Sequence, residues 1–248
     1  MASIINASTT STSGLVQTAD ASGVLQLQSN GVTGLTVGTG GVLTAANGMV
    51  FSSMTLGTAT AGEFEYDGKV PYFTPAGTQR GVIPGMQMYT IWNGVVGSNA
   101  TGNQSILGVG VTLNSNTTYV YELYWYMSKS AGTTSHTVSI NYGGTASISS
   151  HGITYYTVPT SNGTLTNNPV YGNYTSVFPF VFTGAITTSS YAVTTLVKGT
   201  VGVTTGGTFI PQYALSAAPG GAYTVGNGYM YIYPVGTPGA SVNVGTWA

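Results

Sequence analysis

Three carboxylates lie close together in the stretch GEFEYDGKVPYFTPAGTQRGVIP, residues 62–84. Glu63, Glu65 and Asp67 are spaced i, i+2 and i+4, so an extended backbone would place them on one face of a strand. Clustered carboxylates suit Ca²⁺, and a pair of them suits glycosidase-type acid catalysis. The same spacing is typical of a solvated hairpin face that blocks edge pairing, with Lys69 and Arg80 as the basic partners. We favour the hairpin face, which leaves the three carboxylates as weak candidates for a metal site.

The two histidines offer little for nucleophilic catalysis. A Ser/His/acid hydrolase would need His136 or His151 beside a carboxylate, and Glu122 is the only acid after Asp67. Ser135 and His136 are sequence neighbours, so a strand would point them to opposite faces. No GxSxG motif is present. We therefore predict structural or trimer-lining histidines, no catalytic residue and no enzymatic activity.

Exposed aromatic rings are the remaining way to bind a ligand. Sugars stack on Tyr and Trp and accept hydrogen bonds from Asn, Gln and Thr, which are abundant here. The alternative for each ring is burial in the core, and in adjacent tyrosines a regular strand points one ring outward. The candidates for glycan binding are Trp92, Trp125, Tyr155 and Tyr156, with Trp247 as a further tryptophan.

Composition excludes several classes of function. Only 4% of the 248 residues are charged and the net charge is -1, against about 25% charged residues in a typical domain. Nucleic-acid binding needs phosphate neutralisation by Lys and Arg, so it is not expected. There is no cysteine for a disulfide or a thiolate metal site, and we expect no cofactor. No run approaches about 20 apolar residues, so membrane insertion is not expected. The start, MASIINASTT, lacks signal-peptide features, so we expect release by lysis or within a particle.

The elements that carry these residues are predicted to be strands. The 37 glycines and the many β-branched residues and tyrosines disfavour helix and favour sheet. In YVYELYWYM, alternation places Tyr119, Tyr121 and Trp125 on one face, while Glu122 and Tyr124 take the other. Both faces are partly apolar, as expected for a strand covered on both sides. The predicted strands, which suggest an antiparallel sandwich or jelly roll, are 105–113, 118–127, 136–142, 153–158, 176–182, 192–197, 208–213 and 228–233.

Composition divides the chain into three zones. Residues 1–61 hold one charge and short apolar alternations separated by glycine turns, which predicts a β stem that docks on a particle and on copies of itself. Residues 62–84 hold five of the nine charges and predict a hairpin, turning at Asp67-Gly68, and a linker. Residues 85–248 carry nearly all the aromatics and predict the sandwich domain.

Three stretches resemble virion proteins of tailed bacteriophages. They are MASIINASTTSTSGLVQTADASGVLQLQSNGVTGLTV, then GEFEYDGKVPYFTPAGTQRGVI, then LNSNTTYVYELYWYMSKSAGTTSHTVSINYGG, which together cover about half the chain. The resemblance implies a homotrimer at the virion surface, assembled in the bacterial cytoplasm, whose first zone attaches to the particle while its last domain projects. Tail fibres of this kind usually begin with a larger adaptor domain. This sequence shows none, which favours capsid decoration, a short head fibre, or a fibre bound through its extreme N-terminus.

Three functions are therefore in view. The first is a capsid decoration protein or head fibre, whose partners are other copies and other virion proteins of the capsid or tail. The second is a tail fibre that attaches to host surface glycans. The third, a glycan-degrading tailspike, would need an intersubunit acid pair around Glu122 or Glu63 and Glu65, and we favour it least.

Overall fold

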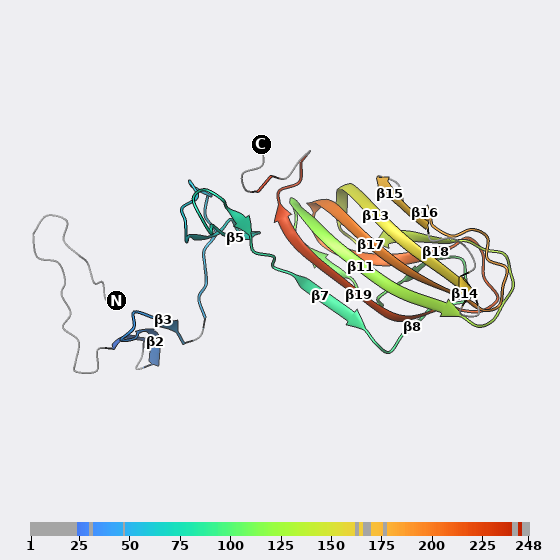
Figure 1. Ribbon diagram of the computed structural model, residues 1–248, viewed down its shortest axis with the longest axis horizontal. Helices are drawn as coiled ribbons and strands as arrows, with labels where there is room; N and C mark the ends of the chain where they lie inside the picture. Colours follow the sequence, from blue (N-terminus) through green and yellow to red (C-terminus); the bar gives the residue numbers. More distant parts are fainter. Residues whose placement is uncertain are drawn as a thin grey trace, which may run out of the picture. The chain divides into compact units, whose positions relative to one another are not determined.

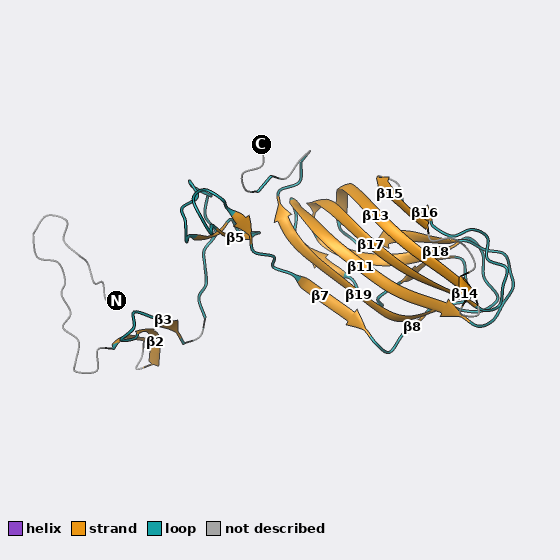
Figure 2. Cartoon of the chain, viewed as in Figure 1, coloured by secondary structure: helices purple, strands orange, loops and turns teal. Residues whose placement is uncertain are grey.

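The computed structural model describes residues 24–29, 32–46, 48–161, 164–165, 170–175, 178–239 and 243–244. The chain forms two compact units, Met1–Phe51 and Ser52–Ala248. Within the described residues every regular element is a strand and all strand pairs are antiparallel (Figure 2). The predicted all-β class is therefore confirmed.

The first unit contains a three-stranded sheet, β1 (Leu25–Ser29), β2 (Val32–Val37) and β3 (Leu43–Ala45). A glycine turn at 38–41 joins the last two strands, and Gly41 adopts a left-handed φ of 73°. The apolar side chains of this sheet, including Leu25, Leu27 and Leu43, are largely exposed. This sheet therefore buries little apolar surface of its own.

The second unit begins with a small sheet, β4 (Phe64–Tyr66), β5 (Pro71–Phe73) and β6 (Gly81–Val82). The predicted turn at Asp67-Gly68 is confirmed: Gly68 has a left-handed φ of 92°, and Asp67 Oδ1 accepts the N–H groups of Lys69 and Val70 at 2.8 and 2.7 Å. Val70 and Tyr72 are its buried apolar residues. We call residues 52–84 the joint.

Two larger sheets form the sandwich, with the eight-stranded sheet in front of the five-stranded one in Figure 1. The eight-stranded sheet has the order β14-β13-β17-β11-β19-β7, with β15 beside β13 and β8 beside β19. Its strands are β7 (Gln87–Ile91), β8 (Val95–Val96), β11 (Thr117–Lys129), β13 (Ser147–Ser161), β14 (Thr164–Leu165), β15 (Val170–Thr175), β17 (Tyr191–Thr205) and β19 (Thr224–Gly236).

The five-stranded sheet has the order β10-β18-β12-β16, with β9 also beside β18. Its strands are β9 (Gly102–Ser105), β10 (Val111–Leu113), β12 (Val138–Gly143), β16 (Phe180–Val181) and β18 (Gly207–Leu215). The sheet therefore draws its strands from both halves of the sandwich sequence.

Several predicted strands differ from the observed ones. The predicted strand 105–113 is wrong as one element, because β9 and β10 are separated by a turn in which Gly108 has a φ of 74°. In the predicted strand 136–142, β12 begins only at Val138, and His136 forms an isolated bridge with Ile186. The predicted strand 176–182 is reduced to β16, and residues 176–177 lie outside the described part. β13 and β17 are longer than predicted, since pairing on both sides carries them past their glycines.

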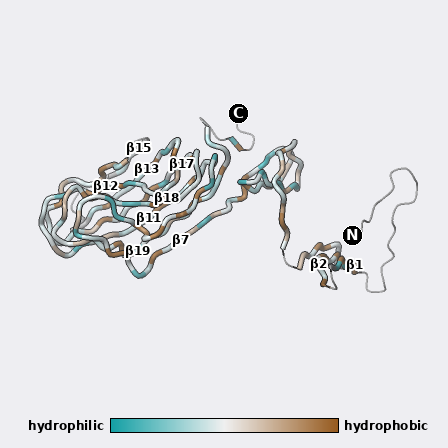
Figure 3. Tube along the Cα trace, turned by 180° about the vertical axis from the view of Figure 1, so that it is seen from behind, coloured by the Kyte–Doolittle hydropathy of each residue, from teal (hydrophilic) through white to brown (hydrophobic). Residues whose placement is uncertain are grey.

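The core lies between the two large sheets. The predicted alternation of β11 is confirmed: Tyr119, Tyr121 and Trp125 are buried, whereas Glu122 and Tyr124 are half-buried on the outer face. The hydropathy of the chain changes repeatedly along these strands (Figure 3). Gly199 faces the buried ring of Tyr121, where an added Cβ would come within 2.5 Å of it. Glycine is therefore required here for close packing of the aromatic core.

Candidate functional site

The three carboxylates of the joint do not form one cluster. Glu65 is 1% exposed and accepts a two-pronged ion pair from Arg80, with Nε–Oε2 at 2.6 Å and Nη2–Oε1 at 2.9 Å. Glu63 Oε2 accepts the backbone N–H of Thr60 at 3.0 Å. Asp67 accepts hydrogen bonds within its own turn and from the Tyr72 hydroxyl at 3.0 Å. Burial, with a smaller contribution from this carboxylate, raises the pKa of Tyr72.

Two expectations for this region are therefore corrected. β4 is too short to align Glu63, Glu65 and Asp67 on one face, and each side chain serves a different part of the hairpin. The described residues contain no group of three or more His, Asp or Glu placed to hold a metal ion. The hairpin face is not simply solvated either, because Glu65 is buried. Of the two expected basic partners, Arg80 pairs as predicted, while Lys69 donates to the carbonyl oxygen of Asn116 at 2.7 Å.

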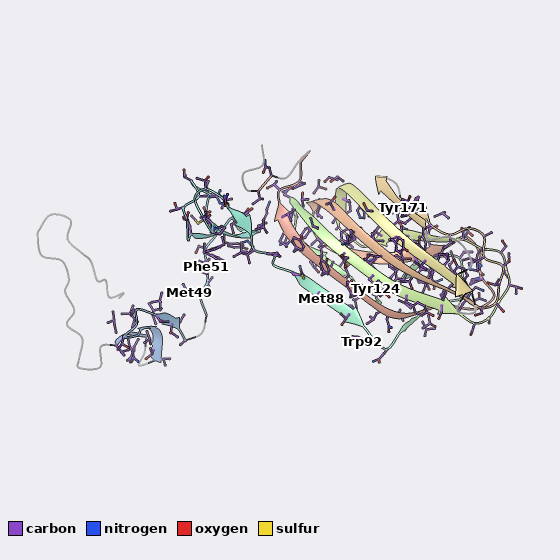
Figure 4. All side chains as sticks on the ribbon, viewed as in Figure 1. Met49, Phe51, Met88, Trp92, Tyr124 and Tyr171 are labelled. Atoms are coloured by element: carbon purple, nitrogen blue, oxygen red, sulfur yellow. The ribbon has the colours of Figure 1, made fainter. Side chains whose placement is uncertain are left out.

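The four aromatic candidates separate into buried and exposed rings. Trp125 is fully buried edge-to-face against Phe182, and Tyr155 is buried with its ring 5.0 Å from that of Phe180. Both candidates are therefore wrong as surface ligand sites. Trp92, in the turn after β7 in Figure 4, is 80% exposed, and Tyr156 is 46% exposed. Trp247 lies outside the described residues.

Both histidines are buried and bonded to tyrosines. His136 Nε2 lies 2.8 Å from the Tyr223 hydroxyl, and its Nδ1 lies 2.7 Å from the carbonyl oxygen of Thr134. His151 Nε2 lies 2.8 Å from the Tyr121 hydroxyl. Burial lowers the pKa of both imidazoles, and that of His151 falls to about 4. Neutral histidines with tyrosine partners fit the predicted structural role.

The outer face of the eight-stranded sheet, which we call the tyrosine face, carries a row of mostly aromatic side chains. Strand register places these residues side by side across six strands, although they come from distant parts of the sequence. Tyr124 and Tyr171 are labelled on this face in Figure 4. The row from β15 to β7 is Tyr171, Tyr156, Leu196, Tyr124, Tyr229 and Thr90.

An ion pair stands at the centre of the next row of the tyrosine face. Lys198 Nζ lies 3.2 Å from Glu122 Oε2, and the Tyr229 hydroxyl donates to Glu122 Oε1 at 2.8 Å. Burial raises the pKa of Glu122, but hydrogen bonds from Tyr229, Lys198 and Tyr231 outweigh it, and the net pKa is lowered. The same carboxylate raises the pKa of Tyr229 to about 12. The pair cancels its own charge, which leaves this face neutral.

Ring orientation decides what the tyrosine face can contact. The rings of Tyr124 and Tyr229 are stacked with centroids 5.5 Å apart and 22° between planes. Tyr229 and Tyr231 are also stacked, at 6.3 Å and 6°. Because these rings turn their faces to one another, they offer edges and hydroxyls outward. That surface suits hydrogen-bonded protein contact better than sugar stacking, which needs an open ring face.

The β7 edge of the same sheet is the second candidate surface. β7 is the last strand in the sheet order, and an apolar groove of about 270 Å³ opens between it and β10. Tyr89 lines this groove and is 45% exposed. Exposed apolar residues gather on this edge: Met86, Met88, Tyr89, Trp92, Val96 and Val109.

Sequence reasoning missed these two surfaces as sites. The outer residues of YVYELYWYM indicated a covered face, but the tyrosines of β19 join them only through register. The comparisons with known proteins add no identification: no protein-family model and no curated protein matches the chain. Among the described residues, no helix has the length and apolar character needed to cross a membrane.

Proposed function

We propose that this chain is a non-enzymatic structural protein of a tailed-phage virion. In this role it acts as a homotrimer at the particle surface, as a capsid decoration protein or short head fibre. The proposed location in a virion rests on the resemblance of three sequence stretches to phage virion proteins. The main observation in favour of assembly with other copies is the uncharged, apolar β7 edge.

An exposed apolar edge strand normally pairs with other chains unless charge, proline or another element protects it. No charged residue occurs between Arg80 and Glu122, and β7, with the sequence QMYTI, contains no proline. The adjoining groove is lined by apolar side chains such as Leu107, Val109 and Met230. Contiguous exposed apolar surface of this kind marks protein–protein contact. Cover by a neighbouring copy would satisfy both the strand edge and the groove.

The tyrosine face and the first unit support the same function. A neutral tyrosine face lets identical copies approach without repulsion, and tyrosine is enriched in protein interfaces. In the first unit, the linking residues Met49, Val50 and Phe51 are exposed as well. Such surface suits docking of residues 1–61 on neighbouring copies or on the particle.

The assembly is tested with the full chain in solution. Wild-type protein should sediment as a trimer at micromolar concentration. Met88→Lys, which puts a charge on the β7 edge, should shift it towards monomer. Val181→Lys serves as the control, because Val181 is similarly exposed but lies on β16 of the other sheet. A monomeric wild type, or equal effects of the two variants, would contradict the role of this edge.

Virion location is tested by antibody labelling of purified particles. Label spread over the capsid supports decoration or a head fibre. Label confined to the tail would favour the second candidate, a tail fibre that binds host glycans. The observation in favour of that candidate is Trp92, whose ring is 80% exposed. Particles without label would contradict a virion protein of either kind.

A further inference from the structure

A hollow of about 600 Å³ opens in the sandwich where β13 begins. It adjoins the tyrosine face at Thr200, which also lines the surface around Glu122 and Lys198, and it shares no lining residue with the groove at the β7 edge. The proposed function does not use it. Its volume falls within the roughly 300–1,000 Å³ typical of small-molecule sites. The lining residues are Tyr142, Ile148, Ser149, Ser150, His151, Gly152, Phe178 and Thr200.

A bulge in β13 shapes this hollow. The residues from Ile148 to Gly152 all line the hollow, which therefore follows the strand over its first residues. Register with β17 shifts at Ser147/Ile148 and at Ile148/Ser150, so the bulge lies at Ile148 and Ser149, and the pairing is regular again from Ser150 to Gly152. A Cβ at the facing Gly202 would come within 2.6 Å of Ser150 Oγ and 2.9 Å of Ser149 Oγ. The bulge and Gly202 together make room for two serine hydroxyls; bulges that re-aim side chains often occur at functional sites.

Three aromatic rings meet at the wall of the hollow. The ring centroids of Tyr142 and His151 are 4.4 Å apart, and those of Tyr142 and Phe178 are 4.9 Å apart at 85°. His151 and Phe178 are 4.6 Å apart. Contact on several sides holds these rings in fixed positions, and fixed aromatic walls are what a small ligand with an apolar face needs.

The polar groups of the hollow carry no charge. The Tyr121 hydroxyl lies 2.7 Å from the Tyr142 hydroxyl and 2.8 Å from His151 Nε2, which forms a chain of hydrogen bonds into the wall. Burial keeps the imidazole of His151 neutral at physiological pH, and no Asp, Glu, Lys or Arg lines the hollow. Phosphate, sulfate or sialic acid would find no cation here. A ligand with neutral hydroxyls would find hydroxyl partners in Ser149, Ser150 and Thr200.

We propose that this hollow binds a neutral saccharide unit. Tyr142 is stacked on Phe209, with centroids 5.0 Å apart and 11° between planes, so it does not offer a free ring for stacking. The C–H groups of a pyranose ring would instead make apolar contacts with Tyr142 and Phe178, and its hydroxyls would bond to Ser149, Ser150 and Thr200. The site differs from the exposed rings of Trp92 and Tyr156, so the two modes of glycan binding predict different effects of mutation.

The full chain is tested against an array of neutral hexoses, N-acetylhexosamines and their oligomers, with sialylated and sulfated glycans as the anionic set. Affinities of the hits are measured by calorimetry. We expect binding within the neutral set that does not weaken with added NaCl, because no ion pair contributes. Phe178→Ala should weaken it about tenfold through loss of ring contact. The double variant Ser149→Ala, Ser150→Ala should weaken it as well, and it keeps the proposal testable if Phe178→Ala fails to fold.

Trp92→Ala and Tyr156→Ala are the matched controls and should bind as wild type does. Thermal melting confirms that each variant is folded. Three results would overturn the proposal: no binding to any neutral glycan, binding confined to the anionic set, or binding lost in the Trp92 or Tyr156 variant while the serine double variant keeps it. None of these outcomes bears on the trimer or on virion location, which have their own tests.

Discussion

The joint and the sandwich each contain an ion pair, and the two pairs differ in how far their side chains are exposed to water. In the joint, Glu65 is 1% exposed, and two nitrogens of Arg80 donate hydrogen bonds to its carboxylate. On the sandwich, Glu122 meets a Lys198 side chain that is 67% exposed. The joint is small and buries few apolar residues, whereas the sandwich has a continuous apolar core. Charge should therefore stabilise the joint, and apolar packing should stabilise the sandwich.

The largest expected effect tests whether apolar packing stabilises the sandwich. Trp125→Ala removes the largest fully buried side chain of the sandwich. We expect a loss of about 3–5 kcal/mol in the free energy of unfolding of the sandwich, measured by urea denaturation of the full chain. Trp92→Ala is the matched control, and since Trp92 is exposed it should cost little. Equal losses in the two variants would mean that the core does not dominate stability.

The next effect is a pH dependence that belongs to the sandwich. The pKa of His151 is about 4 in the folded chain and 6.5 when unfolded, so the unfolded chain binds its proton first as pH falls. Stability is full above pH 6.5 and is lost between pH 6.5 and 4, by about 3 kcal/mol for this group. His136 acts in the same direction.

A variant isolates the contribution of His151. The difference in unfolding free energy between wild type and His151→Gln should change by that amount over this pH window, because the carboxylates and His136 contribute equally to both proteins. A constant difference across the window would show that burial of His151 does not depress its pKa.

The joint tests the charge side of the comparison. Glu65→Gln removes the charge that pairs with Arg80, and we expect a loss of about 2 kcal/mol, less than for a fully buried pair because Arg80 keeps contact with water. Hydrogen exchange should report faster opening of β4–β6 and little change in β11 or β17. Glu63→Gln, beside it in sequence and bonded only to the backbone of Thr60, is the control. Exchange that speeds up in the sandwich instead would contradict a local role.

The sequence predicted what depends on local pattern. Alternation in YVYELYWYM placed Trp125 and Tyr124 on opposite faces of one strand, and Asp67-Gly68 identified the hairpin turn. Both signals come from a few neighbouring residues, and backbone geometry alone converts them into structure. The all-β class follows from the same kind of evidence.

The sites depend on contacts between distant residues, which local pattern does not contain. Tyr124 and Tyr229 are adjacent only because β11 pairs with β19 in one register. The spacing of Glu63, Glu65 and Asp67 indicated a shared face, but the tight turn and the approach of Arg80 gave each carboxylate a separate partner. The hollow around His151 requires a bulge and a facing glycine from another strand.

The smallest expected effect sharpens the comparison of the two ion pairs. Lys198→Met breaks the pair on the sandwich, and we expect a change below about 1 kcal/mol in unfolding free energy, because water screens the charge of the exposed Lys198. The Tyr229 hydroxyl still holds Glu122, so the carboxylate stays ionised near neutral pH while its pKa rises from the lowered value. NMR titration of Glu122 should show that rise, and urea denaturation should show almost no loss. A loss as large as that of Glu65→Gln would mean that the different burial of the two ion pairs does not decide how much each one stabilises the protein. If the loss is small, charge stabilises this protein only where apolar burial is scarce, and the pair on the tyrosine face serves to neutralise a surface that meets other molecules.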